Sequence, residues 1–461
     1  MRPLVAAALV VGCSSSSSSD SSALHDSAPG LEVGEDSSFD ATSDAVPDTA
    51  TDTAPPFVPT KVALEPIFES ATPQKTPPTW NAHLSKLVGD SSFLYAVHTS
   101  FSDDVASRWA AIVRRPRGGG SWTEVGRLSY VHQPPGVVLD PGGTLHLVFD
   151  CLRPSAADVT CFTGGAGTAG RTSRFYRLAF SSRGSDSALR FDTYANYNEW
   201  TAESNGYHSL GLLDDGTVVF SLADSSWNRV VQYRTKAGDA GTIATLSRPS
   251  TYLLYPIAFG GPSALGFFAG EFDPKGGTNA GYPAATIFSG TLTGLTERLK
   301  IEPLTTVGPG EIGAYPSDVE VAPDGTVYAL VYRRNGDQCT ELLRFDGGLG
   351  ATPARTFVGC FETYAKLQLA RDGRLFLLTS GDSAGMKLGI SADRGATFTF
   401  GTLAFDKPLG AGDVHVIGAT PVKRSSSPLL HDPDVFTFFA AGLDASGTSK
   451  RSYLGTIRLS R

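Results

Sequence analysis

The stretch Pro323-Asp-Gly-Thr-Val-Tyr-Ala-Leu-Val331 places a tight polar turn directly before a continuous apolar run. Asp-Gly between β-rich segments is a strong hairpin signal, because glycine accepts the positive φ that such a turn requires. The same turn and run recur at Asp140-Pro-Gly-Gly-Thr-Leu-His-Leu-Val-Phe149, Asp214-Asp-Gly-Thr-Val-Val-Phe-Ser-Leu222 and Arg371-Asp-Gly-Arg-Leu-Phe-Leu-Leu378. A hairpin that recurs in this way predicts a repeat architecture.

Weaker copies of the hairpin bring the number of repeats to seven. They are Gly89-Asp-Ser-Ser-Phe-Leu-Tyr-Ala-Val97, Gly260-Gly-Pro-Ser-Ala-Leu-Gly-Phe-Phe268 and a stretch around 425–439. Successive copies lie 46 to 74 residues apart, which leaves room for four short strands each, and no helical periodicity is sustained. We therefore predict an all-β fold, a β-propeller of about seven four-stranded blades. Two separate β-sandwiches are the alternative, but they would not require one hairpin type to recur.

The fifth repeat can be divided into strands at 318–322, 326–332, 340–345 and 355–361. This division puts Cys339 at the start of the third strand and Cys360 at the end of the antiparallel fourth, side by side, which favours a disulfide. Cys151 and Cys161 would close the base of a long loop in the second repeat. Apart from Cys13 the chain has these four cysteines, an even number that fits an oxidising compartment.

The seventh repeat lacks a fourth strand of its own. Strands are expected at 414–420, 435–441 and 453–459, after which the sequence given ends. The segment 62–68 is predicted to supply the missing outer strand. That pairing would close the ring and hide two sheet edges.

The first residues have the pattern of an export signal. Met1 and Arg2 precede an apolar run at 3–11 that is far too short to span a bilayer. Val10-Val11-Gly12-Cys13 resembles the lipobox of bacterial lipoproteins. The resemblance implies cleavage after residue 12, acylation of Cys13 and attachment to a membrane, in a Gram-negative bacterium usually the outer membrane.

Residues 13–60 are expected to form an acidic, disordered tether between the lipid and a propeller domain at 61–461. Residues 14–60 contain nine acids and no Lys or Arg, in a background of Ser, Thr, Ala and Pro that cannot bury enough apolar surface to fold. The whole chain has 38 basic and 46 acidic residues, and removing Arg2 and those nine acids leaves 37 of each. A neutral domain lacks the basic excess that nucleic-acid binding uses, so no nucleic-acid partner is expected.

One motif in the sixth repeat resembles that of a known family. Ser391-Ala-Asp393-Arg-Gly395-Ala-Thr397-Phe398 resembles the Asp box of sialidase-like and BNR-repeat propellers, and Arg117-Gly-Gly-Gly-Ser-Trp122-Thr looks like a copy without the aspartate. The resemblance implies a structural turn between third and fourth strands, in which Asp393 accepts backbone hydrogen bonds, Gly395 supplies an unusual φ and Phe398 packs between sheets. The Phe/Tyr-Arg-Ile-Pro segment of sialidases does not occur, so the motif supports the fold rather than that activity.

Ligands usually bind propellers where the innermost strands begin, around the mouth of the central channel. One His or Tyr occurs at that position in each repeat, and such rings suit hydrogen bonding to and stacking on a sugar. The predicted ligand-binding residues are His83, His132, His208, Tyr255, Tyr315, Tyr364 and His415.

Two functions remain open from the sequence. The favoured one is binding of an extracellular glycan or protein at this mouth by a monomer without chemistry. The alternative is a polysaccharide lyase or glycoside hydrolase, with His132 or His208 as base and a loop acid assisting. The acids expected on that face are Asp103, Asp104, Glu203, Asp224, Asp273, Asp337 and Asp382.

The sequence contains no cofactor motif and only faint signals for a metal site. The sequence contains no phosphate-binding glycine loop, no nucleophile elbow and no EF-hand spacing. We therefore predict no cofactor and no metal site.

If Cys13 is acylated, the expressed protein should partition into the detergent phase of a Triton X-114 separation. Cys13→Ala should move it to the aqueous phase, because the variant has no thiol for the lipid to join. Equal partitioning of the two proteins would rule out the lipid anchor.

Overall fold

The computed structural model describes a chain built from strands. The described residues are 62–70, 84–100, 108–129, 131, 134–153, 173–183, 189–200, 208–224, 226–248, 250–261, 264–273, 281–304, 313–335, 337–361, 365–379, 386–404, 416–421, 435–443 and 450–459. All of them belong to the compact unit Pro56–Arg461. No helix among these residues is long and apolar enough to cross a membrane.

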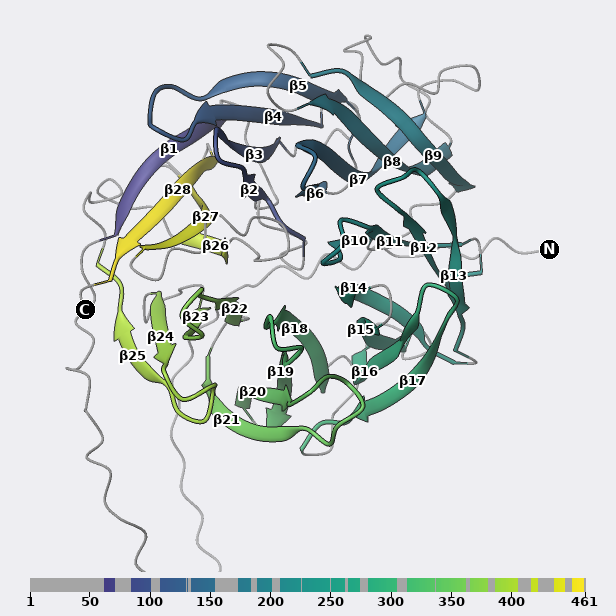
Figure 1. Cartoon of the computed structure of the whole chain (residues 1–461), viewed down its shortest axis with the longest axis vertical. Helices are drawn as coiled ribbons and strands as arrows, with labels where there is room; N and C mark the ends of the chain where they lie inside the picture. The colour runs from purple at the N-terminus through teal and green to yellow at the C-terminus, as the bar shows by residue number, and fades with distance from the viewer. Residues whose placement is uncertain are drawn as a thin grey trace, which may run out of the picture. The chain divides into compact units, whose positions relative to one another are not determined.

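Seven four-stranded antiparallel sheets form this unit, and Figure 1 shows them arranged around one axis. Blade 1 consists of β2 (Leu87–Gly89), β3 (Phe93–Ser100), β4 (Trp109–Pro116) and β5 (Thr123–Ser129). Blade 2 consists of β6 (Gly136–Leu139), β7 (Thr144–Arg153), β8 (Ser173–Arg183) and β9 (Phe191–Trp200). Blade 3 consists of β10 (Ser209–Leu212), β11 (Val218–Ala223), β12 (Arg229–Arg234) and β13 (Ala240–Leu246). Blade 4 consists of β14 (Tyr252–Gly261), β15 (Ala264–Asp273), β16 (Gly281–Thr291) and β17 (Gly294–Ile301). Blade 5 consists of β18 (Ala314–Val321), β19 (Val327–Asn335), β20 (Asp337–Phe345) and β21 (Ala354–Cys360). Blade 6 consists of β22 (Ala365–Leu369), β23 (Leu375–Thr379), β24 (Lys387–Ser391) and β25 (Thr399–Thr402). The predicted propeller of four-stranded blades is confirmed.

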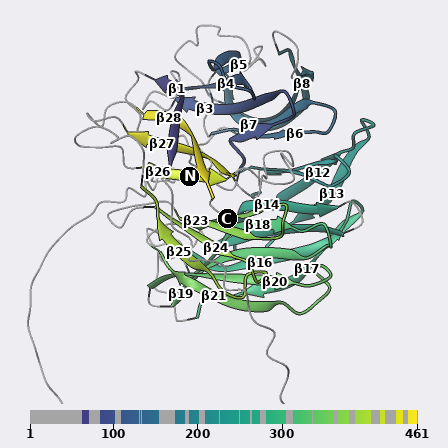
Figure 2. The ribbon, with the colours of Figure 1, turned by 60° about the vertical axis from the view of Figure 1, so that its left-hand side comes forward.

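Blade 7 takes its outer strand from the other end of the chain. It contains β26 (Val416–Pro421), β27 (Val435–Leu443) and β28 (Lys450–Arg458), and β1 (Ala63–Ser70) pairs antiparallel with β28. Figures 1 and 2 both place β1 beside β28. The predicted closure by the segment 62–68 is therefore confirmed, with the observed strand one to two residues further along.

The hairpins that predicted the repeats share one hydrogen-bonding pattern. In blade 5 the amide of Gly325 donates to the carbonyl of Ala322 (2.9 Å), and the amide of Ala322 donates to the carbonyl of Thr326 (2.8 Å). Blades 2, 3 and 6 repeat both bonds, and the glycine has a φ between 82° and 88° in all four turns. In blade 2, where two glycines follow Pro141, the glycine with the positive φ is Gly143.

The runs behind these turns are mostly apolar because both faces of each sheet are covered. Successive residues of a strand point to opposite faces. In β19, Val327, Ala329 and Val331 pack against blade 4, whereas Tyr328 and Leu330 pack against blade 6. A strand covered on one face only would alternate polar and apolar residues.

The apolar core is divided among the boundaries between blades. Among the described residues, buried side chains form seven clusters, one between each blade and the next, including one between blades 7 and 1. Each cluster contains residues of two neighbouring sheets, so no blade has a core of its own. The ring is therefore one folding unit.

Polar contacts reinforce the boundary between blades 7 and 1. Glu65 of β1 accepts a hydrogen bond from the indole of Trp122 (2.9 Å) and pairs with Arg115 of β4 (2.9 Å). Nδ1 of His98 in β3 lies 2.6 Å from the hydroxyl of Ser452 in β28. The side chain of His98 is fully buried and packs near the ring of Phe68.

The motif at 391–398 forms a tight turn between β24 and β25, as its sequence predicted. The carboxylate of Asp393 accepts hydrogen bonds from the amide of Thr397 (2.9 Å), its hydroxyl (2.6 Å) and the hydroxyl of Ser391 (2.7 Å). Gly395 has a φ of 84°, and a Cβ there would lie 2.3 Å from Leu342 of blade 5. Phe398 packs on the cluster between blades 5 and 6, and Trp122, in the equivalent turn of blade 1, packs on the cluster between blades 7 and 1.

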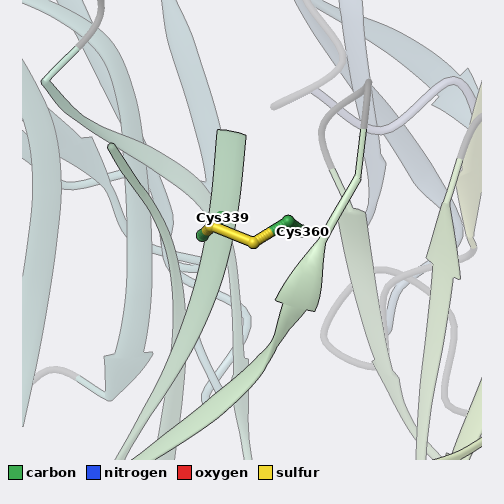
Figure 3. The surroundings of a disulfide bond; sticks show 2 residues. All are labelled: Cys339 and Cys360. Carbon is green, nitrogen blue, oxygen red and sulfur yellow. A yellow bond between two sulfur atoms is a disulfide. The ribbon is translucent and has the colours of Figure 1, made fainter. Parts of the chain in front are cut away.

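Cys339 and Cys360 form a disulfide across β20 and β21, as predicted (Figure 3). The two residues are cross-strand partners, with their Cα atoms 3.9 Å apart. Cys151 lies in β7, but Cys161 is outside the described residues, so the second predicted disulfide stays a prediction.

Asp393→Ala should destabilise the propeller by about 1 to 2 kcal/mol, because three hydrogen bonds to a carboxylate are lost in one turn. Chemical denaturation at neutral pH measures the loss. Asp393→Asn keeps one acceptor oxygen and should lose less. Equal stability of Asp393→Ala and the wild type would contradict the structural role of the turn.

The His98 contact should make ring stability depend on pH. Burial, and secondarily the charge of Arg127, lower the pKa of His98 to about 3. An unfolded chain takes up this proton below about pH 6.5, whereas the folded chain does not until about pH 3. His98 thus stabilises the fold fully above pH 6.5, and this contribution is lost as the pH falls towards 3.

We expect His98→Gln to reduce the slope of unfolding free energy against pH between 6 and 4 by up to about 1.4 kcal/mol per pH unit. Ser452→Ala is the matched variant, since it removes the hydrogen bond but keeps the buried imidazole and should therefore keep the slope. A slope that His98→Gln leaves unchanged would contradict the burial of a neutral imidazole.

Candidate functional site

The two ends of the ring are built from different segments. At one end, here called the entrance face, the innermost strands begin and the loops between second and third strands lie. The opposite end, the turn face, carries the glycine turns and the turn at Asp393. Of the predicted ligand-binding residues, the three that the structure describes, His208, Tyr255 and Tyr315, belong to strands or strand starts at the entrance face.

The structure brings two of the seven predicted residues together. The rings of Tyr255, in β14 of blade 4, and Tyr315, in β18 of blade 5, meet edge to face with centroids 4.7 Å apart and an angle of 61°. Tyr315 is buried and Tyr255 half-buried. This pair thus joins the entrances of two neighbouring blades.

Tyr255 has an unusual backbone conformation. Its φ is 50°, which bulky residues rarely adopt, and the pairing of β14 with β15 shifts register between Leu254 and Ile257. A positive φ at a non-glycine residue costs on the order of 1 to 3 kcal/mol and often occurs at functional sites. The strain marks Tyr255 as a candidate binding residue.

His208 lies directly before β10 at the entrance of blade 3, where the sequence placed it. Its side chain has no exposed surface. A side chain without exposed surface does not line the entrance face in the way that the sequence predicted. His83, His132, Tyr364 and His415 lie outside the described residues.

A second aromatic pair was not predicted from the sequence. Trp227, in the loop between β11 and β12, stacks on Tyr252 at the start of β14, with centroids 4.7 Å apart and an angle of 14°. Phe272 of β15 lies beside Tyr252, with ring centroids 6.4 Å apart. Trp227 also has a positive φ, 63°, and the third non-glycine case among the described residues is Arg394 in the turn at Asp393. The signal available in the sequence was a Trp within a short polar loop.

Asp224, one of the predicted loop acids, is used by its own loop. Its carboxylate accepts hydrogen bonds from the amides of Ser226 (2.8 Å) and Asn228 (2.9 Å) and from the side-chain amide of Asn228 (2.9 Å). These hydrogen bonds to the carboxylate order the loop that carries Trp227. Asp273 ends β15 and Asp337 begins β20, while the other four predicted acids, Asp103, Asp104, Glu203 and Asp382, lie outside the described residues.

Buried lysine and arginine side chains link neighbouring blades to one another. Nζ of Lys86, before β2, donates to the carbonyl of Pro135 before β6 (2.6 Å), and burial lowers the pKa of Lys86 well below its usual value. Lys366 of β22 donates to the carbonyl of Ser317 in β18, and Arg229 of β12 donates to that of Leu253 in β14. Within the described part of the chain, no group of three or more His, Cys, Asp or Glu residues is arranged to hold a metal ion.

The fold and its closure define the chain as a β-propeller of four-stranded blades. No model of a known protein family matches the chain. No curated protein matches it either.

Solved structures similar to the chain are propellers. A polysaccharide lyase of family PL25, an ulvan lyase, is 12% identical with a TM-score of 0.52, and the match covers 84% of this chain and 96% of that chain. The same type of enzyme bound to -[GlcA(1-4)Rha3S]- has a TM-score of 0.53 at 12% identity, with the same coverage. The polysaccharide lyase Uly1 has a TM-score of 0.50 at 12% identity, with 82% and 90% covered. At this identity the similarity shows the fold.

Proposed function

We propose that this chain is a secreted lipoprotein whose propeller binds an extracellular glycan at the entrance face. The lipid on Cys13 would hold it at a membrane surface, in a Gram-negative bacterium the outer membrane. The acidic segment 13–60 would separate the propeller from that surface. The turn at Asp393 supports a relationship to sialidase-like and BNR-repeat propellers.

The contact between Tyr255 and Tyr315 is the observation that carries the proposal. Sugars present apolar C–H faces and hydroxyl edges, and tyrosine offers a ring for the first and a phenol for the second. Neither ring belongs to the apolar cluster between blades 4 and 5, the pair lies at the joint of these two blades, and Tyr255 is held in a strained conformation. Strain of this kind persists where the surrounding structure enforces a functional arrangement.

The second candidate is a polysaccharide lyase or glycoside hydrolase acting at the same face. It is favoured by the similar fold of two polysaccharide lyases, the ulvan lyase of family PL25 and Uly1. His132 or His208 would be the base. The burial of His208 and the use of Asp224 by its own loop make binding without chemistry the first choice.

Tyr255→Ala should weaken binding to the recognised glycan about threefold to tenfold, since aromatic contacts contribute about 0.5 to 1.5 kcal/mol. The wild type is first screened against immobilised ulvan, alginate, polygalacturonate, arabinan and dextran, and the affinity is then measured by calorimetry. Phe357→Ala is the matched control, because Phe357 is an aromatic residue of β21 that is 61% exposed. A wild type that binds none of the five, or a Tyr255→Ala variant with full affinity, would contradict glycan binding at this face.

The enzyme alternative has its own readout. The same polysaccharides are incubated with the protein while the absorbance of unsaturated products and new reducing ends are followed. Product formation that is lost in His132→Ala or His208→Ala would replace the binding proposal with the catalytic one.

A further inference from the structure

The innermost strand of blade 4 carries an aromatic contact towards each neighbouring blade. Tyr252 stacks on Trp227 of blade 3, and Tyr255 contacts Tyr315 of blade 5. Tyr252 and Tyr255 are three residues apart in β14, which corresponds to about 10 Å along an extended strand. The two aromatic pairs therefore lie on either side of one strand, one towards blade 3 and one towards blade 5, with Tyr255 further from the start of the strand than Tyr252.

The stack of Trp227 and Tyr252 is not part of the apolar core. Neither ring belongs to any of the seven clusters between blades, and both side chains are half-buried. Blades 3 and 4 are already joined by a buried cluster that includes Leu213, Val231 and Phe267. Holding these two blades together therefore does not require the stack.

Trp227 has a backbone conformation that favours glycine. The amide of Trp227 donates to the carbonyl of Asp224 (3.0 Å), and the amide of Asp224 donates to that of Asn228 (2.9 Å), so the backbone closes a tight turn. The position has a φ of 63°, which glycine adopts without cost and a bulky residue does not. A tryptophan at this position therefore costs conformational free energy that a glycine would not.

Arg229 sets the distance between the loop and the strand. Its side chain is 1% exposed, and its guanidinium donates to the carbonyl of Leu253 through Nε (3.0 Å) and Nη2. Arg229 follows Trp227 by two residues, and Leu253 directly follows Tyr252. One buried residue therefore fixes both members of the stack, which gives a rigid platform of the kind that binds ligands with a low entropic cost.

We propose that the two aromatic pairs are successive subsites for one glycan chain, so that the ligand is an extended polysaccharide crossing blades 3 to 5. The pair of Tyr255 and Tyr315 takes one sugar residue, and the platform of Trp227 and Tyr252 stacks on another. This inference rests on the proposed glycan binding. It adds that affinity depends on chain length and that Trp227 contributes only when the ligand reaches it.

The test measures affinity against chain length. The polysaccharide of the panel that binds best is cut into size-fractionated oligosaccharides, and calorimetry is performed with the wild type, Trp227→Gly, Tyr255→Ala and the control Phe357→Ala. We expect Trp227→Gly to lose about tenfold in affinity for chains long enough to cover both pairs and to leave the shortest binding chains unaffected. Tyr255→Ala should weaken every length, and Phe357→Ala none.

Thermal unfolding separates binding from a merely structural role. Trp227→Gly relieves the positive φ, so its melting temperature should equal or exceed that of the wild type while long-chain affinity falls. A lower melting temperature with unchanged long-chain affinity would make the stack structural and overturn the inference. If Tyr255→Ala weakens binding and Trp227→Gly does not weaken it at any chain length, the proposed function stands and the second subsite is overturned. A wild type that binds none of the polysaccharides overturns both.

Discussion

Packing of each sheet against two neighbours is the constraint on which the structure depends. Each sheet must present apolar side chains on both of its faces, because a cluster of buried side chains fills each boundary between blades. Such an arrangement has no natural end except closure on itself. The pairing of β1 with β28 satisfies this requirement, and Glu65, Trp122 and Arg115 fix the closing strand to blade 1.

The entrance face can carry strained and polar residues because the boundaries supply the stability. Trp227 and Tyr255 adopt positive φ values next to strands that buried bonds hold in register. Arg229 performs this task for β14, and Lys366 links β22 to β18. On the turn face, a glycine, Gly395, takes a positive φ in the turn, and the carboxylate of Asp393 holds the turn by hydrogen bonds.

Local signals explain why much of the fold could be predicted from the sequence. Asp-Gly turns fix hairpins through backbone geometry alone, and the cross-strand placement of Cys339 and Cys360 follows from two turns and the strand lengths. The candidate site was harder to predict from the sequence. The stack of Trp227 on Tyr252 joins residues of different blades, and the burial of His208 depends on neighbours that no local pattern specifies. The register shift in β14, which places Tyr255 against Tyr315, also has no sequence signature beyond Pro256.

The pairing of β1 with β28 has a consequence for how the chain folds. Ala63 and Thr456 are cross-strand partners, although nearly the whole domain separates them in sequence. Contacts of such separation are formed late, because the entropy of closing a long loop must be lost first. During folding, β1 therefore stays unpaired until β28 is available. An open solenoid can fray repeat by repeat from its ends. This ring has no terminal repeat, and its opening would release the first and last blades together.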